Sequence, residues 1–160
     1  MEKDSTMAEQ LLTHDVTWHI DYRIHLGETW SRFFHGLVAR EIRATVCTSC
    51  DRTFVPPQSF CEHCFEPVDK WTTVSPKGTL HVATIIYRGF EGGPTPPYAV
   101  GGIQLDGADT LLMHHIGGID LSDPDAARAT LRRGLRVEAV WADERTGSIM
   151  DIRHFVRTDE

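Results

Sequence analysis

The chain has 160 residues and a formal net charge of −7, with 41% hydrophobic and 24% charged residues. This is the composition of one ordinary folded domain, or of a domain with a small appendage, and it excludes a disordered chain. No apolar run approaches the ~20 residues that a membrane helix needs. No third of the chain is basic, which argues against a protein built to bind nucleic acid.

The N-terminal segment MEKDSTMAEQ is polar and acidic and lacks the apolar stretch of a signal peptide. We therefore expect a cytoplasmic protein, in a reducing compartment where clustered cysteines bind metal more often than they form disulfides. Apolar residues then alternate along residues 15–26, a pattern that fits a strand or an extended arm.

Residues 27–42 change to a helical period, with an aromatic-rich stripe along one face. The stripe consists of Trp30, Phe33, Phe34, Leu37 and Val38. A helix this short needs a surface to pack against. It either covers the core of its own chain or docks onto another protein. In the second case, we expect Trp30, Phe33, Phe34 and Leu37 to bind the partner.

All four cysteines lie in the stretch CTSCDRTFVPPQSFCEHC, as two C-x-x-C pairs with ten residues between them. The predicted metal ligands are Cys47, Cys50, Cys61 and Cys64. Two such turns present four thiolates to one point, which suits tetrahedral zinc. Because four sulfurs leave no position for water or substrate, we expect a structural site. Iron fits the same ligands and stays open as an alternative.

Three neighbours of these cysteines bear on the site. His63 lies between the last two cysteines, and we interpret it as a spectator because a ligand role would displace a better-placed sulfur. The residue after the second cysteine of such a turn often adopts a left-handed conformation. Asp51 tolerates that conformation, whereas Phe65 adopts it only at a steric cost. We therefore expect the second turn to close with different dihedral angles from the first.

From Trp71 onward, short segments rich in β-branched residues alternate with turns. The expected strands span residues 71–75, 79–88, 98–105, 109–116, 135–144 and 148–157. A helix is expected over 120–134, with Ser122 or Asp123 as its N-cap and Pro124 in its first turn. Short, evenly spaced strands with a helix before the last two fit a five-stranded OB-fold barrel.

The sequence contains no spare cysteine, no nucleophile elbow and no phosphate-binding glycine loop. His114 and His115 are adjacent, so on a strand they point to opposite faces and at most one lines any site. Asp106 and Asp109 are interpreted as turn formers. Three arginines at positions 128, 132 and 136 fit a solvated face, although a phosphate-bearing ligand could use them.

Taken together, these features resemble a family of rubredoxin-like zinc ribbon plus OB-fold proteins associated with thiolases and acyl-CoA enzymes, catalogued as domain of unknown function 35. The resemblance covers residues from about 20 to 157. It rests on the two C-x-x-C pairs with two prolines between them, followed in order by Trp71, Gly78-Thr79 and Pro97-Tyr98. Asp51 departs from the pattern, because the family often has glycine there.

The resemblance implies a mainly β fold with an N-terminal helix, a rubredoxin-like zinc ribbon and a C-terminal five-stranded OB-fold barrel with one helix. We expect a tail and helix over 1–43, the ribbon over 44–70 and the barrel over 71–160.

The resemblance also implies a non-catalytic accessory subunit of a thiolase-like acyl-CoA enzyme, that is, a thiolase, acyltransferase or aldolase. A thiolase-fold partner in a hetero-oligomer would then supply the catalytic residue. Acyl-CoA would bind at or near the shared site. The residues that we expect near it are Tyr87, Arg88, Tyr98 and His114.

Two other functions stay open at this stage. Zinc ribbons and OB barrels also occur in nucleic-acid-binding proteins, but a net charge of −7 and only three lysines argue against that function here. A rubredoxin-type electron carrier would contain iron and would absorb visible light.

Overall fold

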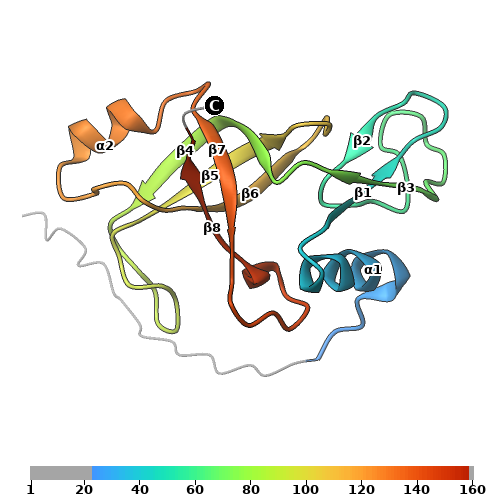
Figure 1. The fold of residues 1–160 in the computed structure, drawn as a ribbon, viewed down its shortest axis with the longest axis horizontal. Coiled ribbons are helices and arrows are strands. Elements are labelled where there is room, and N and C mark those ends of the chain that lie inside the picture. Colours follow the sequence, from blue (N-terminus) through green and yellow to red (C-terminus); the bar gives the residue numbers. More distant parts are fainter. Residues whose placement is uncertain (1–22, 159–160) are drawn as a thin grey trace, which may run out of the picture.

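The computed structural model describes residues 23–158, and its elements follow one another from a helix through a small sheet to a barrel (Figure 1). Most of the strand or arm expected over 15–26 lies outside the described residues. The part that is described, 23–26, is exposed and has no regular secondary structure. None of the helices between residues 23 and 158 has the length and apolar content needed to span a bilayer.

The ribbon contains a three-stranded antiparallel sheet in the order β2-β1-β3. Its strands are β1 (Ile42–Val46), β2 (Thr53–Phe54) and β3 (Lys70–Val74). Strand β1 pairs with β3 along its whole length, from Ile42 opposite Val74 to Val46 opposite Lys70. Strand β3 corresponds to the segment 71–75, which we expected to lead into the barrel. It pairs with the ribbon instead.

Five strands close the barrel that was predicted from their spacing. They are β4 (Lys77–Ile86), β5 (Tyr98–Leu105), β6 (Leu111–Ile116), β7 (Arg136–Trp141) and β8 (Ile152–Arg157). Their order is β4-β5-β6-β8-β7, and β7 pairs back onto the start of β4. The β6–β8 pair is parallel, whereas the other pairs are antiparallel. The fold is therefore mainly β, with the predicted five-stranded barrel and one helix between β6 and β7.

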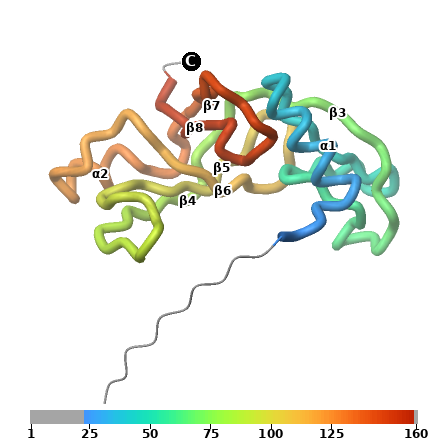
Figure 2. The backbone as a smooth tube through the Cα atoms, turned by 90° about the horizontal axis from the view of Figure 1, so that it is seen from below, coloured from blue at the N-terminus to red at the C-terminus, as the bar shows by residue number. Residues whose placement is uncertain are grey.

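That helix, α2 (Pro124–Thr130), is shorter than the predicted 120–134. Its start agrees with the prediction, because the Asp123 side chain accepts hydrogen bonds from the next turn, at 2.9 Å from Asp125 N and 3.2 Å from Ala126 N. The helix ends at Thr130, and the chain reaches β7 through a turn in which Gly134 has a φ of +91°. Figures 1 and 2 both place α2 at the opposite end of the molecule from the ribbon.

Helix α1 (Gly27–Val38) is also shorter than the predicted 27–42. It ends because Arg40 adopts a left-handed conformation with a φ of +60°, and Glu41 N then donates back to Gly36 O at 2.9 Å. Arg145, from the loop between β7 and β8, donates to the free carbonyl of Val38 at 2.8 Å. The end of α1 is therefore joined to the barrel.

One hydrophobic core extends through all three parts of the molecule. Phe33 and Leu37 of α1 are fully buried and belong to the same cluster as Ile42 of the ribbon and Leu80 of the barrel. A second, small cluster surrounds the cysteines and contains Cys47, Phe54, Cys61 and Val68. The aromatic stripe of α1 thus covers the core of its own chain, one of the two alternatives that the sequence left open.

Replacing Phe33 tests how much this helix contributes to stability. We expect Phe33→Ala to lower the free energy of unfolding of the metal-loaded chain by about 3–5 kcal/mol, because the ring is fully buried. The matched control Trp30→Ala removes a ring that is 39% exposed and should cost at most about 1.5 kcal/mol. Urea denaturation measures both, and equal losses would contradict the packing described above.

Candidate metal centre

Each C-x-x-C pair forms a tight turn of the same kind, and the two turns face each other. In both turns, the N–H of the first cysteine donates to the carbonyl five residues later. The residue four positions later donates back to that cysteine's carbonyl. These bonds are 2.8–2.9 Å long around both Cys47 and Cys61. The first turn follows β1 directly, so the ribbon sheet fixes its position.

The two turns also share the backbone conformation that closes them. Asp51 has a φ of +57° and Phe65 a φ of +58°. Our expectation that the second turn would close with different dihedral angles is therefore wrong. Phe65 adopts the left-handed conformation at a cost of roughly 1–2 kcal/mol, and the hydrogen bonds that close the turn, Phe65 N to Cys61 O and Cys61 N to Glu66 O, offset this cost.

The four sulfurs have the spacing of a tetrahedral metal site. All four lie within 4.8 Å of one another, and Cys50 Sγ is 3.8 Å from Cys61 Sγ. A tetrahedron with zinc–sulfur bonds of about 2.3 Å has edges of about 3.8 Å. Cys64 N also donates to Cys61 Sγ at 3.4 Å, which spreads negative charge away from the sulfur. The cluster therefore fits a zinc ribbon.

The thiols also show why a cation belongs here. Burial opposes the ionisation of Cys47, but the N–H groups of Ser49 and Cys50 donate to its sulfur and lower its pKa to about 7. The hydrogen bond with the Cys50 sulfur, followed by burial, raises the pKa of Cys64 to about 12. Four thiols this close cannot all ionise alone, and a divalent cation removes this conflict by binding every thiolate.

His63 stands outside the sulfur cluster. Its side chain is exposed, and its Nδ1 lies 3.8 Å from Cys64 Sγ. It is not a member of the group of ligand atoms that converge on one point. Its position fits the predicted spectator role, and four sulfurs still complete the shell of a tetrahedral metal.

Hydrogen bonds that the sequence did not indicate fix the ribbon to the barrel. Thr53 N donates to Asp109 Oδ2 at 2.8 Å, and Asp109 N donates back to Thr53 O at 2.9 Å. Next to them, Val55 N donates to the Thr110 hydroxyl at 2.7 Å, and that hydroxyl donates to Val55 O at 2.9 Å. Asp109 and Thr110 follow the β5–β6 turn, so this turn holds the ribbon. Below, these four bonds are called the ribbon–barrel joint.

The residues predicted to lie near acyl-CoA are only partly brought together. Tyr87 and Arg88 follow β4, and Tyr98 begins β5, so these three lie at one end of the β4–β5 pair. His114 is separated from them because its side chain is 4% exposed and lies inside the barrel. Its Nε2 donates to Ile149 O at 3.2 Å, and burial lowers its pKa. His115 instead contacts Tyr98, with 5.5 Å between ring centres.

The four residues predicted to bind a partner differ in exposure. Phe33 and Leu37 are fully buried in the core, and Phe34 is partly buried against it. Trp30 is 39% exposed. It borders an open depression of about 410 Å³ whose other walls include Pro56, Pro57 and Phe60 of the ribbon. Of the four, Trp30 therefore offers the largest contact surface.

Replacing one cysteine tests the metal centre. We expect the purified chain to contain one zinc ion. Cys47→Ser should weaken zinc binding by more than about 100-fold, because it removes a ligand that the fold holds in place. The matched control His63→Asn should keep one zinc. Elemental analysis and zinc titration measure both. Less than one metal per wild-type chain, or unchanged stability after chelation, would contradict a structural site.

Comparisons with known proteins agree with this arrangement. The model of the ChsH2 rubredoxin-like zinc ribbon domain matches residues 34–69, and that of the ChsH2 C-terminal OB-fold domain matches residues 71–142. No curated protein matches the chain at a significant level.

Two solved structures have a similar fold. A DUF35-family protein of unknown function from Sulfolobus solfataricus is 25% identical, with a TM-score of 0.56 over 71% of this chain and 78% of that one. The Ltp2-ChsH2(DUF35) aldolase structure is 17% identical, with a TM-score of 0.61 over 84% of this chain and 98% of that one. The second likeness concerns the fold alone. The two family models together cover more than half of the sequence, and the chain belongs to the ChsH2/DUF35 family, in which a rubredoxin-like zinc ribbon precedes an OB-fold domain.

Proposed function

We propose that this chain is a non-catalytic accessory subunit of a thiolase-like acyl-CoA enzyme, that is, a thiolase, acyltransferase or aldolase. The observation that carries the proposal is membership of the ChsH2/DUF35 family with both of its modules present. A structural neighbour is the ChsH2 part of an Ltp2-ChsH2 aldolase complex. In this proposal the chain forms a cytoplasmic hetero-oligomer with a thiolase-fold subunit, and that subunit supplies the catalytic residue.

The buried polar side chains support a role in assembly. Asp151 accepts hydrogen bonds from the N–H groups of Thr146 and Gly147, at 3.0 and 2.9 Å, which shapes the loop next to α1. In His114, both ring nitrogens are used, because Nδ1 accepts from His115 N at 2.8 Å. All four cysteines of the chain converge on the metal centre. These side chains are committed to structure, which fits a subunit that supports chemistry elsewhere.

The surface around Trp30 is the contact that we propose for the partner. The depression beside it has walls from α1 and from the ribbon, so the metal centre and the shared core together determine its shape. A partly exposed tryptophan next to prolines and Phe60 is the kind of anchor that contributes most to protein interfaces. Phe33 and Leu37 would act indirectly, because they hold the helix that carries Trp30.

Acyl-CoA binding is a second element of the proposal. Tyr87 and Arg88 are exposed beside the Gly/Pro loop, and Tyr98 lies next to them with His115 on its ring. An exposed arginine with neighbouring aromatic rings can bind a phosphate and stack on a base. We propose that Tyr87, Arg88 and Tyr98 contact the ligand, and that His114 acts only by supporting the barrel from inside.

Affinity purification of the full chain from its source cells tests the proposal. We expect a thiolase-fold protein to co-purify in stoichiometric amount, and the chain alone to be inactive on acyl-CoA substrates. Trp30→Ala should weaken the complex at least about tenfold, because such anchors contribute 2 kcal/mol or more. The matched control Met113→Ala alters a 56% exposed side chain on the barrel and should leave the affinity unchanged.

The possible outcomes separate the proposed function from the proposed partner surface and from the proposed ligand contact. A chain that purifies as a lone monomer, with no thiolase-fold protein bound, would overturn the proposed function. A stable complex in which Trp30→Ala and Met113→Ala behave alike would overturn only the proposed surface. In the complex, unchanged acyl-CoA affinity after Arg88→Ala would overturn only the proposed ligand contact.

A further inference from the structure

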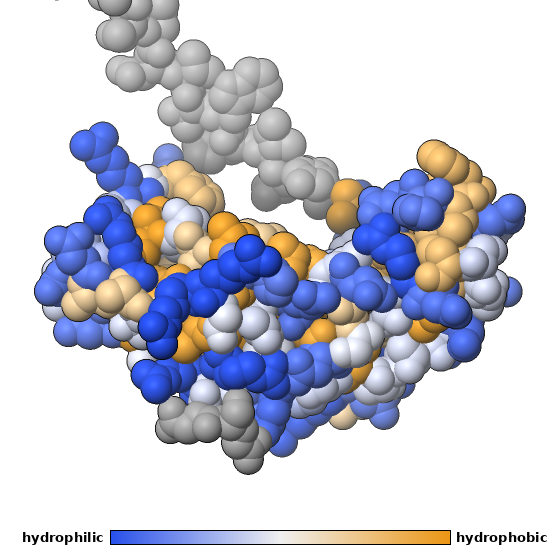
Figure 3. Space-filling model, turned by 90° about the horizontal axis from the view of Figure 1, so that it is seen from above, coloured by the Kyte–Doolittle hydropathy of each residue, from blue (hydrophilic) through white to orange (hydrophobic). Residues whose placement is uncertain are grey.

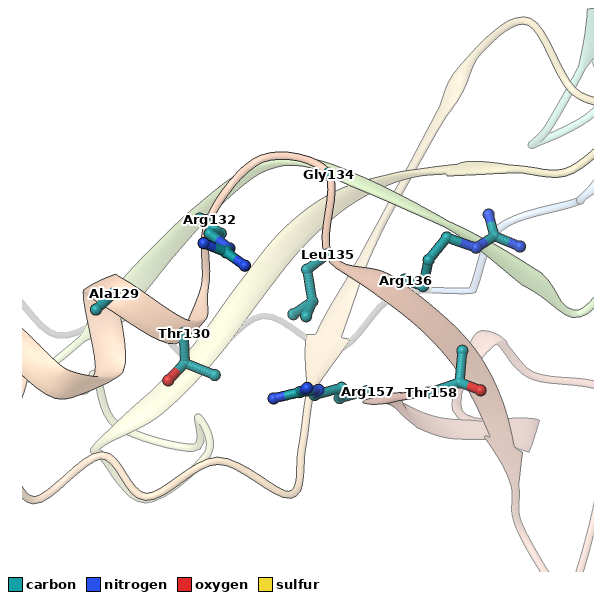
Figure 4. Close-up of a pocket in the computed structure, with 8 residues that line it drawn as sticks. All are labelled: Ala129, Thr130, Arg132, Gly134, Leu135, Arg136, Arg157 and Thr158. Carbon is teal, nitrogen blue, oxygen red and sulfur yellow. The ribbon is translucent and has the colours of Figure 1, made fainter. Parts of the chain in front are cut away.

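A pocket of about 530 Å³ opens at the α2 end of the barrel (Figure 4), and the ribbon with its metal centre lies at the other end of the molecule (Figure 1). It lies between the end of α2, the turn into β7 and the end of β8. The residues that line it are Ala129, Thr130, Arg132, Gly134, Leu135, Arg136, Arg157 and Thr158. None of these residues belongs to the metal centre or to the proposed partner surface. On the face shown in Figure 3, hydrophilic and apolar side chains are mixed at both ends of the molecule.

Positive charge is concentrated around this pocket although the chain is acidic overall. Residues 126–137 contain four arginines and no acidic residue, in a chain of net charge −7. Arg128 forms an ion pair with Asp125 at 3.2 Å, and Arg136 forms a two-pronged pair with Asp106 at 2.8 and 2.6 Å. Arg132 is exposed and forms no ion pair within residues 23–158. Its charge is therefore not neutralised by a neighbouring carboxylate.

Two guanidinium groups reach the pocket from different elements. Arg132 comes from the turn after α2 and Arg157 from the end of β8, and Figure 4 shows both side chains extending toward the same space. Arg136 turns away from that space, toward its own carboxylate partner. The two guanidinium groups approach the pocket from different directions. This arrangement suits a tetrahedral anion better than a planar carboxylate, which one guanidinium group can bind alone through two parallel hydrogen bonds.

The backbone that carries both arginines is fixed by the barrel. Gly134 N donates to Leu80 O at 2.8 Å, and Leu80 N donates to Leu135 O at 2.9 Å. Arg157 lies opposite Val137 in the β7–β8 pair. A ligand that binds between the arginines would need to order only their side chains. Ordering of flexible groups on binding reduces affinity. Because the fold already orders the backbone at this site, less affinity is lost in this way.

From these observations we propose that the pocket binds a small phosphate-bearing ligand, with Arg132 and Arg157 holding its phosphate group. The proposal does not depend on the proposed function, because the pocket belongs to this chain alone. A compact phosphate fits better than an extended polyanion. Asp120 and Arg157 line an adjoining pocket of about 260 Å³, and a carboxylate there would repel further phosphates. The acidic remainder of the chain would also repel nucleic acid.

Calorimetric titration of the full-length, metal-loaded chain with inorganic phosphate and with pyrophosphate tests the proposal. We expect saturable binding at one site, with NMR shift changes confined to the amides of Thr130, Gly134 and Thr158. Arg132→Gln and Arg157→Gln should each weaken binding about tenfold or more, the loss expected for one charge-assisted hydrogen-bonding group. The matched control Arg153→Gln removes the same charge from β8 at a pair with Asp143 and should leave binding unchanged.

Any of three results would overturn the proposal. They are that neither phosphate nor pyrophosphate binds, that Arg153→Gln weakens phosphate binding as much as Arg132→Gln and Arg157→Gln do, or that the NMR shift changes lie elsewhere on the surface. If a single-stranded oligonucleotide bound more tightly than phosphate and pyrophosphate, with a steep salt dependence, the pocket would instead be part of a nucleic-acid-binding surface. Both Arg132 and Arg157 are exposed, so their variants should fold. Zinc content and the unfolding midpoint of each variant check this directly.

Discussion

The ribbon–barrel joint is the constraint on which the rest of this structure depends. Its four hydrogen bonds satisfy both backbone groups of Thr53, in the two-residue strand β2, and of Val55, which follows that strand. The same contact brings Val55 into the core that also contains Phe33 of α1 and Leu112 of β6. The helix, the ribbon and the barrel therefore share one core.

A metal bound at this centre would have a mechanical role. It would close two turns whose own hydrophobic cluster has only a few members, and so would replace the core that such a short segment lacks. One turn begins directly after β1, and Thr45 of that strand exchanges two hydrogen bonds of 2.9 Å with Gln58 between the turns. A bound metal would thereby help to set the walls of the depression beside Trp30. This is how a closed centre can affect function without touching a substrate.

Local sequence patterns predicted the structural features that depend on neighbouring residues. They failed for features that depend on residues far apart in the chain. The segment 98–105 forms β5 as predicted, because its β-branched residues and the Gly107 turn specify a hairpin. Cysteine spacing likewise predicted a cluster of the kind observed. The sequence pattern did not predict the end of α1, because arginine rarely adopts the left-handed conformation that Arg40 has here. Asp109 resembled a simple turn residue because its partner, Thr53, lies 56 residues away. The pattern also could not show that His114 points inward, nor that Arg132 and Arg157 line the same pocket.

We infer from the shared core and the ribbon–barrel joint that the ribbon and the barrel form one rigid body that presents a single surface to a partner. Residual dipolar couplings of the backbone amides, measured on the metal-loaded full chain, test it most directly. We predict that couplings from residues 42–74 and from residues 77–157 fit one alignment tensor. Two tensors of different magnitude or orientation would show that the ribbon moves relative to the barrel, and would contradict a single rigid body.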